Sequence, residues 1–198
     1  MIDSNETVLA FFETRVREAA RARGADPDAP TALYVAGLLA GYAQPGALSK
    51  AALDRPLSLQ LRDALDTVGP ARFERLRGLG DHALYVSGFF AESLERRGVE
   101  RRFVQDLGRT AYDAASAMLR RAAGENRGPH VFDELATHFA DLVKLLEDVA
   151  DALYATSATS PKSVLDVYER WSRRGTPALA QALAGWGIVP LRGSGTLH

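Results

Sequence analysis

The chain contains no cysteine among its 198 residues. This absence excludes disulfide bonds, thiolate metal sites, iron–sulfur clusters and thiol nucleophiles, and it suits a reducing compartment. The sequence also lacks an apolar run of about 20 residues, the length that spans a bilayer. Its N-terminal residues have neither the basic nor the apolar region of a signal peptide. We therefore expect a cytoplasmic protein without membrane-spanning segments.

Lysine is scarce too: three of the 24 basic residues are lysine and the others are arginine. This preference, together with abundant alanine, leucine and glycine, is typical of a GC-rich bacterial genome. The formal net charge of −1 argues against extended contacts with nucleic-acid phosphates. Acidic residues are interleaved with most of the arginine clusters, which favours a solvated surface. Nucleic acid is therefore the least favoured partner.

Sequence motifs of catalysis are missing as well. The chain has no G-x-S-x-G nucleophile elbow, no phosphate-binding P-loop and no dinucleotide fingerprint that follows a strand. It has four histidines, one of them terminal, and no Ser-His-Asp arrangement can be argued from them. We expect no cofactor, and the sequence leans towards a protein that is not an enzyme.

What the sequence does contain is apolar side chains spaced every three or four residues along most of its length, a spacing typical of amphipathic helices. Glycine and proline divide the pattern into segments with short connections. The sequence therefore predicts an all-α fold, a single-domain bundle of about eight or nine helices in residues 1–190. We expect residues 191–198 to form a disordered tail.

The longest predicted helix covers residues of about 129–156. Its apolar positions alternate steps of three and four, as in a seam that packs along a partner helix. These positions are Phe132, Leu135, Phe139, Leu142, Leu146, Val149 and Leu153. Asp133, Lys144 and Asp151 are predicted to point away from this seam.

The most apolar segment runs from Asp81 to Phe90 and is expected to form a helix at the centre of the fold. Gly78 and Gly80 are predicted to end a preceding short helix, which makes Asp81 the N-cap of the next one. A second glycine pair, Gly37-x-x-x-Gly41, predicts a close helix contact in the core.

Three groups of side chains are candidate sites. Polar groups on the central helix predict a ligand pocket, and they are Asp81, His82, Tyr85 and Ser87. Helix capping by Asp81 and hydrogen bonds from the serine to backbone carbonyls are the alternative.

A metal site is the second candidate, because Glu134, His138 and Asp141 share one stripe of the long helix. Their spacing lacks the second Glu-x-x-His copy of di-iron bundles, so a solvated helix flank is the alternative. The third candidate is a protein interface at Trp171, Arg170 and Arg174, because tryptophan and arginine are enriched in interfaces. Trp171 also fits the core face of its own helix.

A resemblance accompanies the central segment. Residues 80–90 read Gly-Asp-His-Ala-Leu-Tyr-Val-Ser-Gly-Phe-Phe, and Leu94 and a Gly-Arg-Thr-Ala-Tyr segment at 108–112 follow. This pattern, in the middle of the chain, resembles one that recurs in uncharacterised bacterial all-α proteins. The resemblance implies a helical family and brings no known activity or ligand.

Two functional hypotheses follow from these observations. The first is a non-enzymatic helical interaction or scaffold module that binds a protein partner or a second copy of itself, as the long seam helix and the Trp171 region indicate. The second is a domain that binds a small molecule or a metal, and could be an enzyme, with a pocket around the Asp81–Phe90 helix and the His138 stripe.

Overall fold

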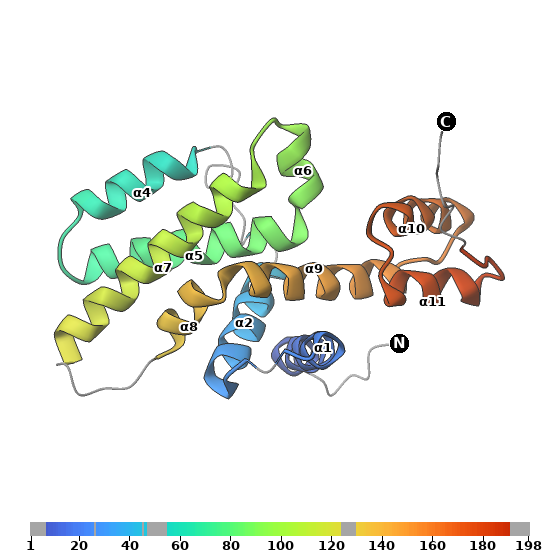
Figure 1. Cartoon of the computed structure of the whole chain (residues 1–198), viewed down its shortest axis with the longest axis horizontal. Helices are drawn as coiled ribbons and strands as arrows, with labels where there is room; N and C mark the ends of the chain where they lie inside the picture. The colour runs from blue at the N-terminus through green and yellow to red at the C-terminus, as the bar shows by residue number, and fades with distance from the viewer. Residues whose placement is uncertain (1–6, 26, 45, 47–54, 124–129, 191–198) are drawn as a thin grey trace. The chain divides into compact units, whose positions relative to one another are not determined.

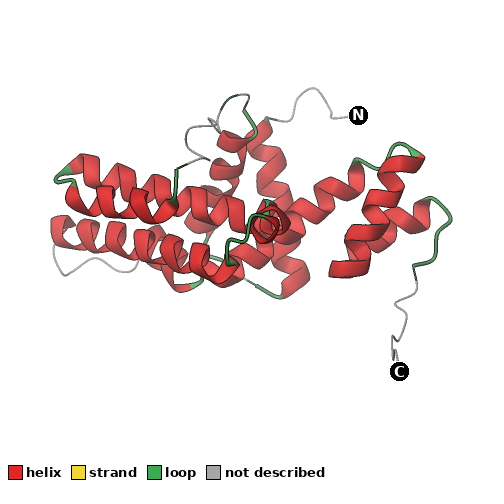
Figure 2. Ribbon diagram, turned by 90° about the horizontal axis from the view of Figure 1, so that it is seen from above, coloured by secondary structure: helices red, strands yellow, loops and turns green. Residues whose placement is uncertain are grey.

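The computed structural model describes residues 7–25, 27–44, 46, 55–123 and 130–190. Within these ranges the chain forms ten α-helices and no β-strand (Figure 2), which confirms the predicted all-α class. A search of the same residues found no helix with the length and hydrophobicity needed to cross a membrane. The tail predicted at 191–198 lies outside the described residues.

The chain divides into two compact units, Met1–Leu146 and Glu147–His198, which we call the N-terminal and the C-terminal unit. The N-terminal unit holds α1 (Val8–Arg23), α2 (Ala29–Tyr42), α4 (Leu57–Asp66), α5 (Pro70–Phe89), α6 (Ala91–Arg96), α7 (Arg101–Ala123) and α8 (Val131–Thr137). The division falls inside α9 (Phe139–Thr156), and the C-terminal unit adds α10 (Pro161–Arg174) and α11 (Pro177–Gly185). The single domain expected for 1–190 stays a prediction.

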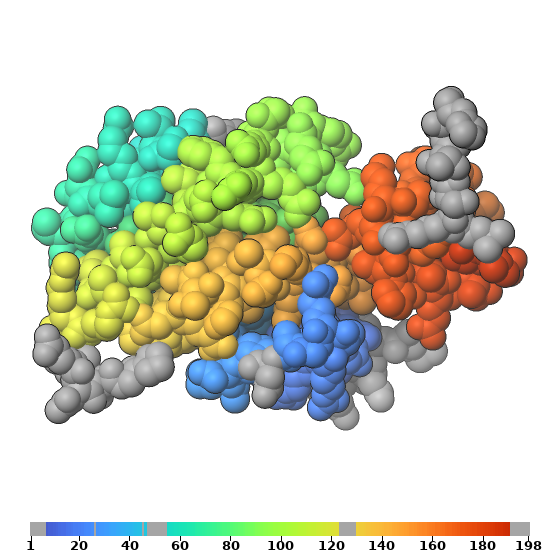
Figure 3. Space-filling view, viewed as in Figure 1, coloured from blue at the N-terminus to red at the C-terminus, as the bar shows by residue number. Residues whose placement is uncertain are grey.

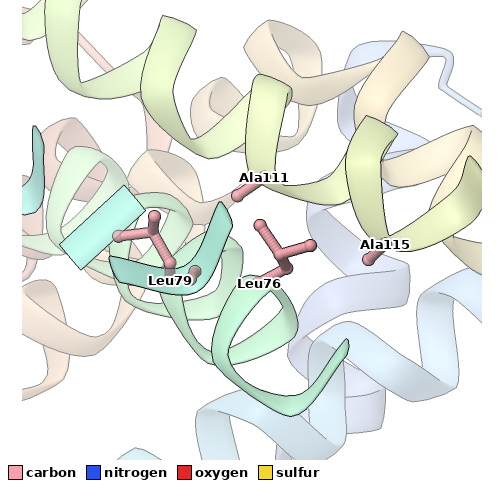
Figure 4. Packing of buried hydrophobic residues seen from close by; sticks show 5 residues of the cluster. Leu76, Leu79, Ala111 and Ala115 are labelled. Carbon is pink, nitrogen blue, oxygen red and sulfur yellow. The ribbon is translucent and has the colours of Figure 1, made fainter. Parts of the chain in front are cut away.

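Helix α5 lies at the centre of the N-terminal unit, between α4 and α7 (Figure 1). Its apolar face packs on small residues of α7, and Figure 4 shows Leu76 and Leu79 opposite Ala111 and Ala115. On the outer face of this layer, α4, α6 and α7 form one continuous surface (Figure 3).

Glycines permit the closest of these contacts. A Cβ on Gly80 would lie 2.5 Å from the ring of Tyr112, and one on Gly108 would lie 2.7 Å from the Cβ of Ala83. Because the residue number rises along α5 while that of its partner on α7 falls, the two helices run antiparallel. Gly88 permits a third close contact, because a Cβ there would lie 2.5 Å from that of Leu146 on α9.

The prediction that Gly78 and Gly80 end a helix is wrong. Helix α5 continues through both glycines and through Asp81, and it ends only at Phe89. Burial explains the difference: a helical glycine loses intrinsic stability, but at position 80 it admits the Tyr112 ring against the α5 backbone. Asp81 is consequently a residue of the helix interior and not an N-cap.

The long helix predicted at 129–156 is present as two consecutive helices, α8 and α9, which meet at His138. His138 has φ −102° and ψ 21°, outside the α-helical range, although its N–H still donates to the Glu134 carbonyl oxygen at 2.9 Å. The apolar seam continues across this interruption, and its members from Phe132 to Val149 are buried.

The C-terminal unit has its own small core. Val164, Val167 and Trp171 of α10 pack on Leu179 and Leu183 of α11. At the start of α10 the Ser160 hydroxyl accepts a hydrogen bond from the backbone N–H of Ser163, and a proline lies in the first turn. These caps satisfy backbone donors that the first turn of a helix leaves unpaired.

Candidate functional site

Asp81 is a carboxylate held inside the N-terminal unit. The hydroxyl of Tyr34 donates to its Oδ1 at 2.6 Å, and the hydroxyl of Tyr112 donates to the same oxygen at 2.7 Å. Tyr34 belongs to α2 and Tyr112 to α7, so the Asp81 carboxylate joins three helices. Its side chain is 15% exposed, and that of Tyr112 is wholly buried.

The other carboxylate oxygen of Asp81 has a weaker interaction. Arg77, one turn earlier on α5, places Nη1 3.8 Å from the Oδ2 of Asp81, which is an ion pair without a hydrogen bond. The guanidinium hydrogen-bonds instead to Glu74, with Nε and Nη2 donating to Oε2 at 3.1 and 2.8 Å. Glu74, Arg77 and Asp81 together carry a net charge of −1.

Burial dominates the electrostatics of this cluster. It raises the pKa of Asp81, while the two tyrosine hydrogen bonds and the charge of Arg77 act in the opposite direction. Burial and the Asp81 charge also raise the pKa of Tyr34 and that of Tyr112 well above their usual range. Both phenols therefore stay protonated and act as donors to the carboxylate.

A cavity of about 430 Å³ lies beside this cluster. Tyr34, Arg77 and Asp81 form its polar end, and the glycines of α2 and the ring of Tyr42 form the rest with Leu38. Its volume falls in the range of about 300–1,000 Å³ that small-molecule sites occupy.

The glycine pair of α2 corrects a second prediction. Gly37 and Gly41 are exposed, and a Cβ on either would meet no atom within 4 Å. They make no close helix contact in the core, so that interpretation is wrong; instead they line the cavity at Asp81. A glycine in a helix lowers its stability by about 0.5–1 kcal/mol relative to alanine, and no packing gain offsets this loss here.

Tyr85 and His82, two of the predicted ligand residues, flank Asp81 on different sides. Tyr85 stacks on Tyr42 with ring centroids 4.3 Å apart, and so supports the aromatic wall of the cavity. His82 is buried and lines a different cavity, on the α4 and α7 side of α5. Consecutive helix residues point about 100° apart, which explains why the structure separates Asp81 from His82.

Ser87 is fully buried, and its Oγ has no hydrogen-bond partner among the described residues. The alternative expected from the sequence, a hydrogen bond to a backbone carbonyl, is therefore wrong. Ser87 lines neither of the two cavities beside α5, and its small side chain precedes the close contact at Gly88.

The predicted metal residues are near one another but have other partners. Glu134, His138 and Asp141 line one cavity of about 380 Å³. The Glu134 carboxylate accepts from the N–H of Asp28 at 3.0 Å and from the Thr31 hydroxyl at 2.6 Å, and so serves the first turn of α2. A search of the described residues finds no group of three histidine, cysteine or acidic residues that could hold a metal ion.

The predicted interface residues lie inside the C-terminal unit. Trp171 is buried in its core. Arg170 and Arg174 donate from Nε to the two carboxylate oxygens of Asp151 at 2.5 and 2.6 Å, and Asp151 is wholly buried. The sequence predicted only that Asp151 points away from the apolar seam. It did not reveal that Asp151 pairs with two arginines.

The sequence did not reveal the partners of Asp81. Tyr34 and Tyr112 lie 47 and 31 residues away along the chain, so only the tertiary fold brings them together. One local signal existed: Arg77 and Asp81 are four residues apart, the spacing of a helical ion pair. Because a helix end was predicted between Arg77 and Asp81, this spacing did not predict an ion pair.

No family model matches the chain, and no curated protein or solved structure matches it either.

Proposed function

We propose that this protein binds a small organic molecule in the cavity between α2 and α5, with the Asp81 carboxylate as its polar anchor. The observation that carries the proposal is a mostly buried carboxylate that accepts two tyrosine hydrogen bonds at one oxygen and lines a 430 Å³ cavity. Convergent polar groups at one end of a pocket are the usual design of a ligand site.

The chemistry of the lining favours a protonated amine. A carboxylate in surroundings of low polarity gains most from a cation that can also donate hydrogen bonds. The rings of Tyr34 and Tyr42 line the same cavity, and aromatic faces attract organic cations. The nearby charges of Glu74, Arg77 and Asp81 sum to −1, so a cation leaves the cluster neutral.

Calorimetry with three probes of one shape tests this proposal: 2-phenylethylammonium, the neutral 2-phenylethanol and the anionic phenylacetate. We expect the ammonium to bind tightest and Asp81→Asn to weaken it about tenfold or more, the loss of one charged hydrogen bond. Asparagine keeps the oxygen that Tyr34 and Tyr112 use, so this variant is expected to fold. Equal binding of the three probes would contradict the proposal.

Two further variants serve as controls. Asp113→Asn removes the same charge from an exposed position of α7 and is expected to leave binding unchanged. Gly41→Leu extends a side chain from a position where a Cβ meets nothing within 4 Å, and it should block the cavity while the helices stay intact by circular dichroism. If Asp81→Asn and Asp113→Asn have the same effect, the anchor is not Asp81.

The interaction module expected from the sequence stays a prediction. The two features on which that hypothesis was based, the apolar seam from Phe132 to Val149 and Trp171, are buried within the chain. A protein partner, self-association, a bacterial origin and a cytoplasmic location also stay predictions. None of the described contacts favours a second function over ligand binding.

A further inference from the structure

The second cavity beside α5 has a different chemical character. It measures about 470 Å³ and lies among the start of α4, the C-terminal half of α5, α6 and the start of α7. Most of its lining is apolar, with Val86, Leu94 and Val104 among the side chains. Two arginines and no acidic residue occur among its described lining residues, so its charge is opposite to that of the Asp81 cluster.

His82 is the buried polar group of this cavity. Its side chain is 8% exposed, and burial lowers the pKa of the imidazole with no charged or hydrogen-bonding neighbour contributing. The ring is therefore neutral at pH 7 and carries one donor and one acceptor nitrogen. No hydrogen bond joins the imidazole to another of the described residues, and a ligand atom in the cavity would supply a partner.

The two arginines of the cavity differ in their availability. Arg55 forms an ion pair with Asp63 of α4. Arg97 is exposed at the C-terminal end of α6 and forms no ion pair with a described residue. Its neighbour Arg96 is equally exposed and does not line the cavity. Arg97 is thus the cation available to an anionic group.

His82 and Arg97 come from different elements that line the cavity. His82, Val86 and Phe90 follow one another at intervals of four residues along α5. At 1.5 Å per residue, His82 lies about 12 Å from Phe90, the residue that follows α5. Phe90 directly precedes α6, whose last turn leads to Arg97. His82 and Arg97 therefore line the same mainly apolar cavity from different elements.

We infer that this cavity binds an elongated, mainly apolar carboxylic acid, with its carboxylate at Arg97 and a second hydrogen-bonding group at His82. The site is separate from the Asp81 cavity and does not depend on the function proposed for it. Arg97 contributes charge-assisted hydrogen bonds at the mouth. Val86, Leu94 and Val104 bury the apolar chain, and His82 selects for a polar atom at the far end.

Titration calorimetry with three probes, each below its micelle concentration, tests both ends of the site. The probes are 10-hydroxydecanoate, decanoate and 1,10-decanediol: decanoate lacks the terminal hydroxyl, and the diol carries a neutral hydroxyl in place of the carboxylate. We expect 10-hydroxydecanoate to bind about tenfold tighter than either, because each end contributes at least one hydrogen bond. Equal affinity for all three probes would overturn the inference.

Two variants assign the ends to residues. Arg97→Gln should weaken 10-hydroxydecanoate about tenfold and leave the diol unchanged, because the diol has no charge to lose. His82→Phe keeps a ring of similar size; it should weaken 10-hydroxydecanoate and leave decanoate unchanged. This comparison is a double-mutant cycle in which the probe is one partner. Loss of binding to all probes alike would contradict the assignment.

Arg96→Gln is the matched control for Arg97→Gln, since it removes the same charge one residue away and is expected to change nothing. Vesicles of phosphatidylglycerol and phosphatidylcholine separate a soluble acid from a lipid surface, because both present an anion on apolar chains. Sedimentation of the protein with these vesicles, without binding of 10-hydroxydecanoate, would replace the inferred ligand by a membrane surface and overturn the inference.

Discussion

At the scale of single residues, the hydrogen bonds of Asp81 tie α2, α5 and α7 together. Two tyrosine hydroxyls donate to one oxygen of a carboxylate that is mostly removed from water. Hydrogen bonds to a charged acceptor are stronger than neutral ones, and removing one donor leaves the charge less compensated. The cluster therefore holds three helices together, and its carboxylate is the ligand anchor proposed above.

Tyr112→Phe measures how much the hydrogen bond from Tyr112 to Asp81 contributes to stability. The ring stays and the donor is lost, so we expect a decrease of about 1–3 kcal/mol in the free energy of unfolding. Urea denaturation followed by circular dichroism measures it. Tyr168→Phe is the matched control, because that hydroxyl is on an exposed residue of α10 and its loss should change stability by less than about 0.5 kcal/mol. Similar losses in the two variants would show that the hydroxyl of Tyr112 contributes nothing particular.

His82 makes stability depend on pH in a definite direction. Burial lowers its pKa in the folded state, so the unfolded chain binds more protons between that lowered pKa and the usual value of about 6.5. Stability therefore rises with pH across this window and is lost as the pH falls through it. Unfolding midpoints measured between pH 7 and pH 5 should fall more for the wild type than for His82→Phe.

At the scale of helices, glycine has opposite roles at positions 37 and 108. A Cβ at Gly37 meets no atom within 4 Å, whereas one at Gly108 would lie 2.7 Å from the Cβ of Ala83. Gly37→Ala should therefore raise the free energy of unfolding by up to about 1 kcal/mol, through the helix propensity of α2. Gly108→Ala should lower it by about 1–3 kcal/mol, through overpacking where α5 crosses α7. Thermal melts of both variants check the signs, and equal signs would contradict this account.

The same glycines show how far the sequence could predict the helices. Apolar spacing is a local property, so it predicts helices where the structure has α4, α7 and α10. Gly80 was interpreted as a helix end because its partner, the Tyr112 ring, is 32 positions away and only the fold brings it near. Gly37 and Gly41 were assigned to a core contact because a small-residue pattern does not tell which face of a helix is covered. For the same reason the sequence identified Asp81 and His82 as candidate ligand residues, but it did not predict that they line separate cavities.

At the scale of the whole molecule, the described residues of each unit include a buried or mostly buried carboxylate with charged neighbours, Asp81 in the N-terminal and Asp151 in the C-terminal unit. In the C-terminal unit, Asp151 receives Arg170 and Arg174, and the Nη1 of Arg174 also lies 3.0 Å from the Oε2 of Glu147. Removing one partner of a buried ion pair leaves the others uncompensated and costs about 3–5 kcal/mol. Burial disfavours the charged form of Arg174, but the hydrogen bond and the charge of Asp151 outweigh it and raise the pKa of that guanidinium.

The distribution of tryptophans and helices allows the unfolding of the two units to be followed separately. Both tryptophans of the chain, Trp171 and Trp186, lie in the C-terminal unit, whereas most helices lie in the N-terminal unit. Tryptophan fluorescence therefore reports unfolding of one unit, and ellipticity at 222 nm mainly that of the other. We expect Asp151→Ala to lower the urea midpoint of fluorescence by more than that of ellipticity, since non-coincident transitions indicate separate cooperative units. Asp166→Ala, at an exposed position of α10, should move neither midpoint. Coincident transitions in Asp151→Ala would instead favour the single domain expected from the sequence, because the shared helix α9 would then couple the two units into one cooperative fold.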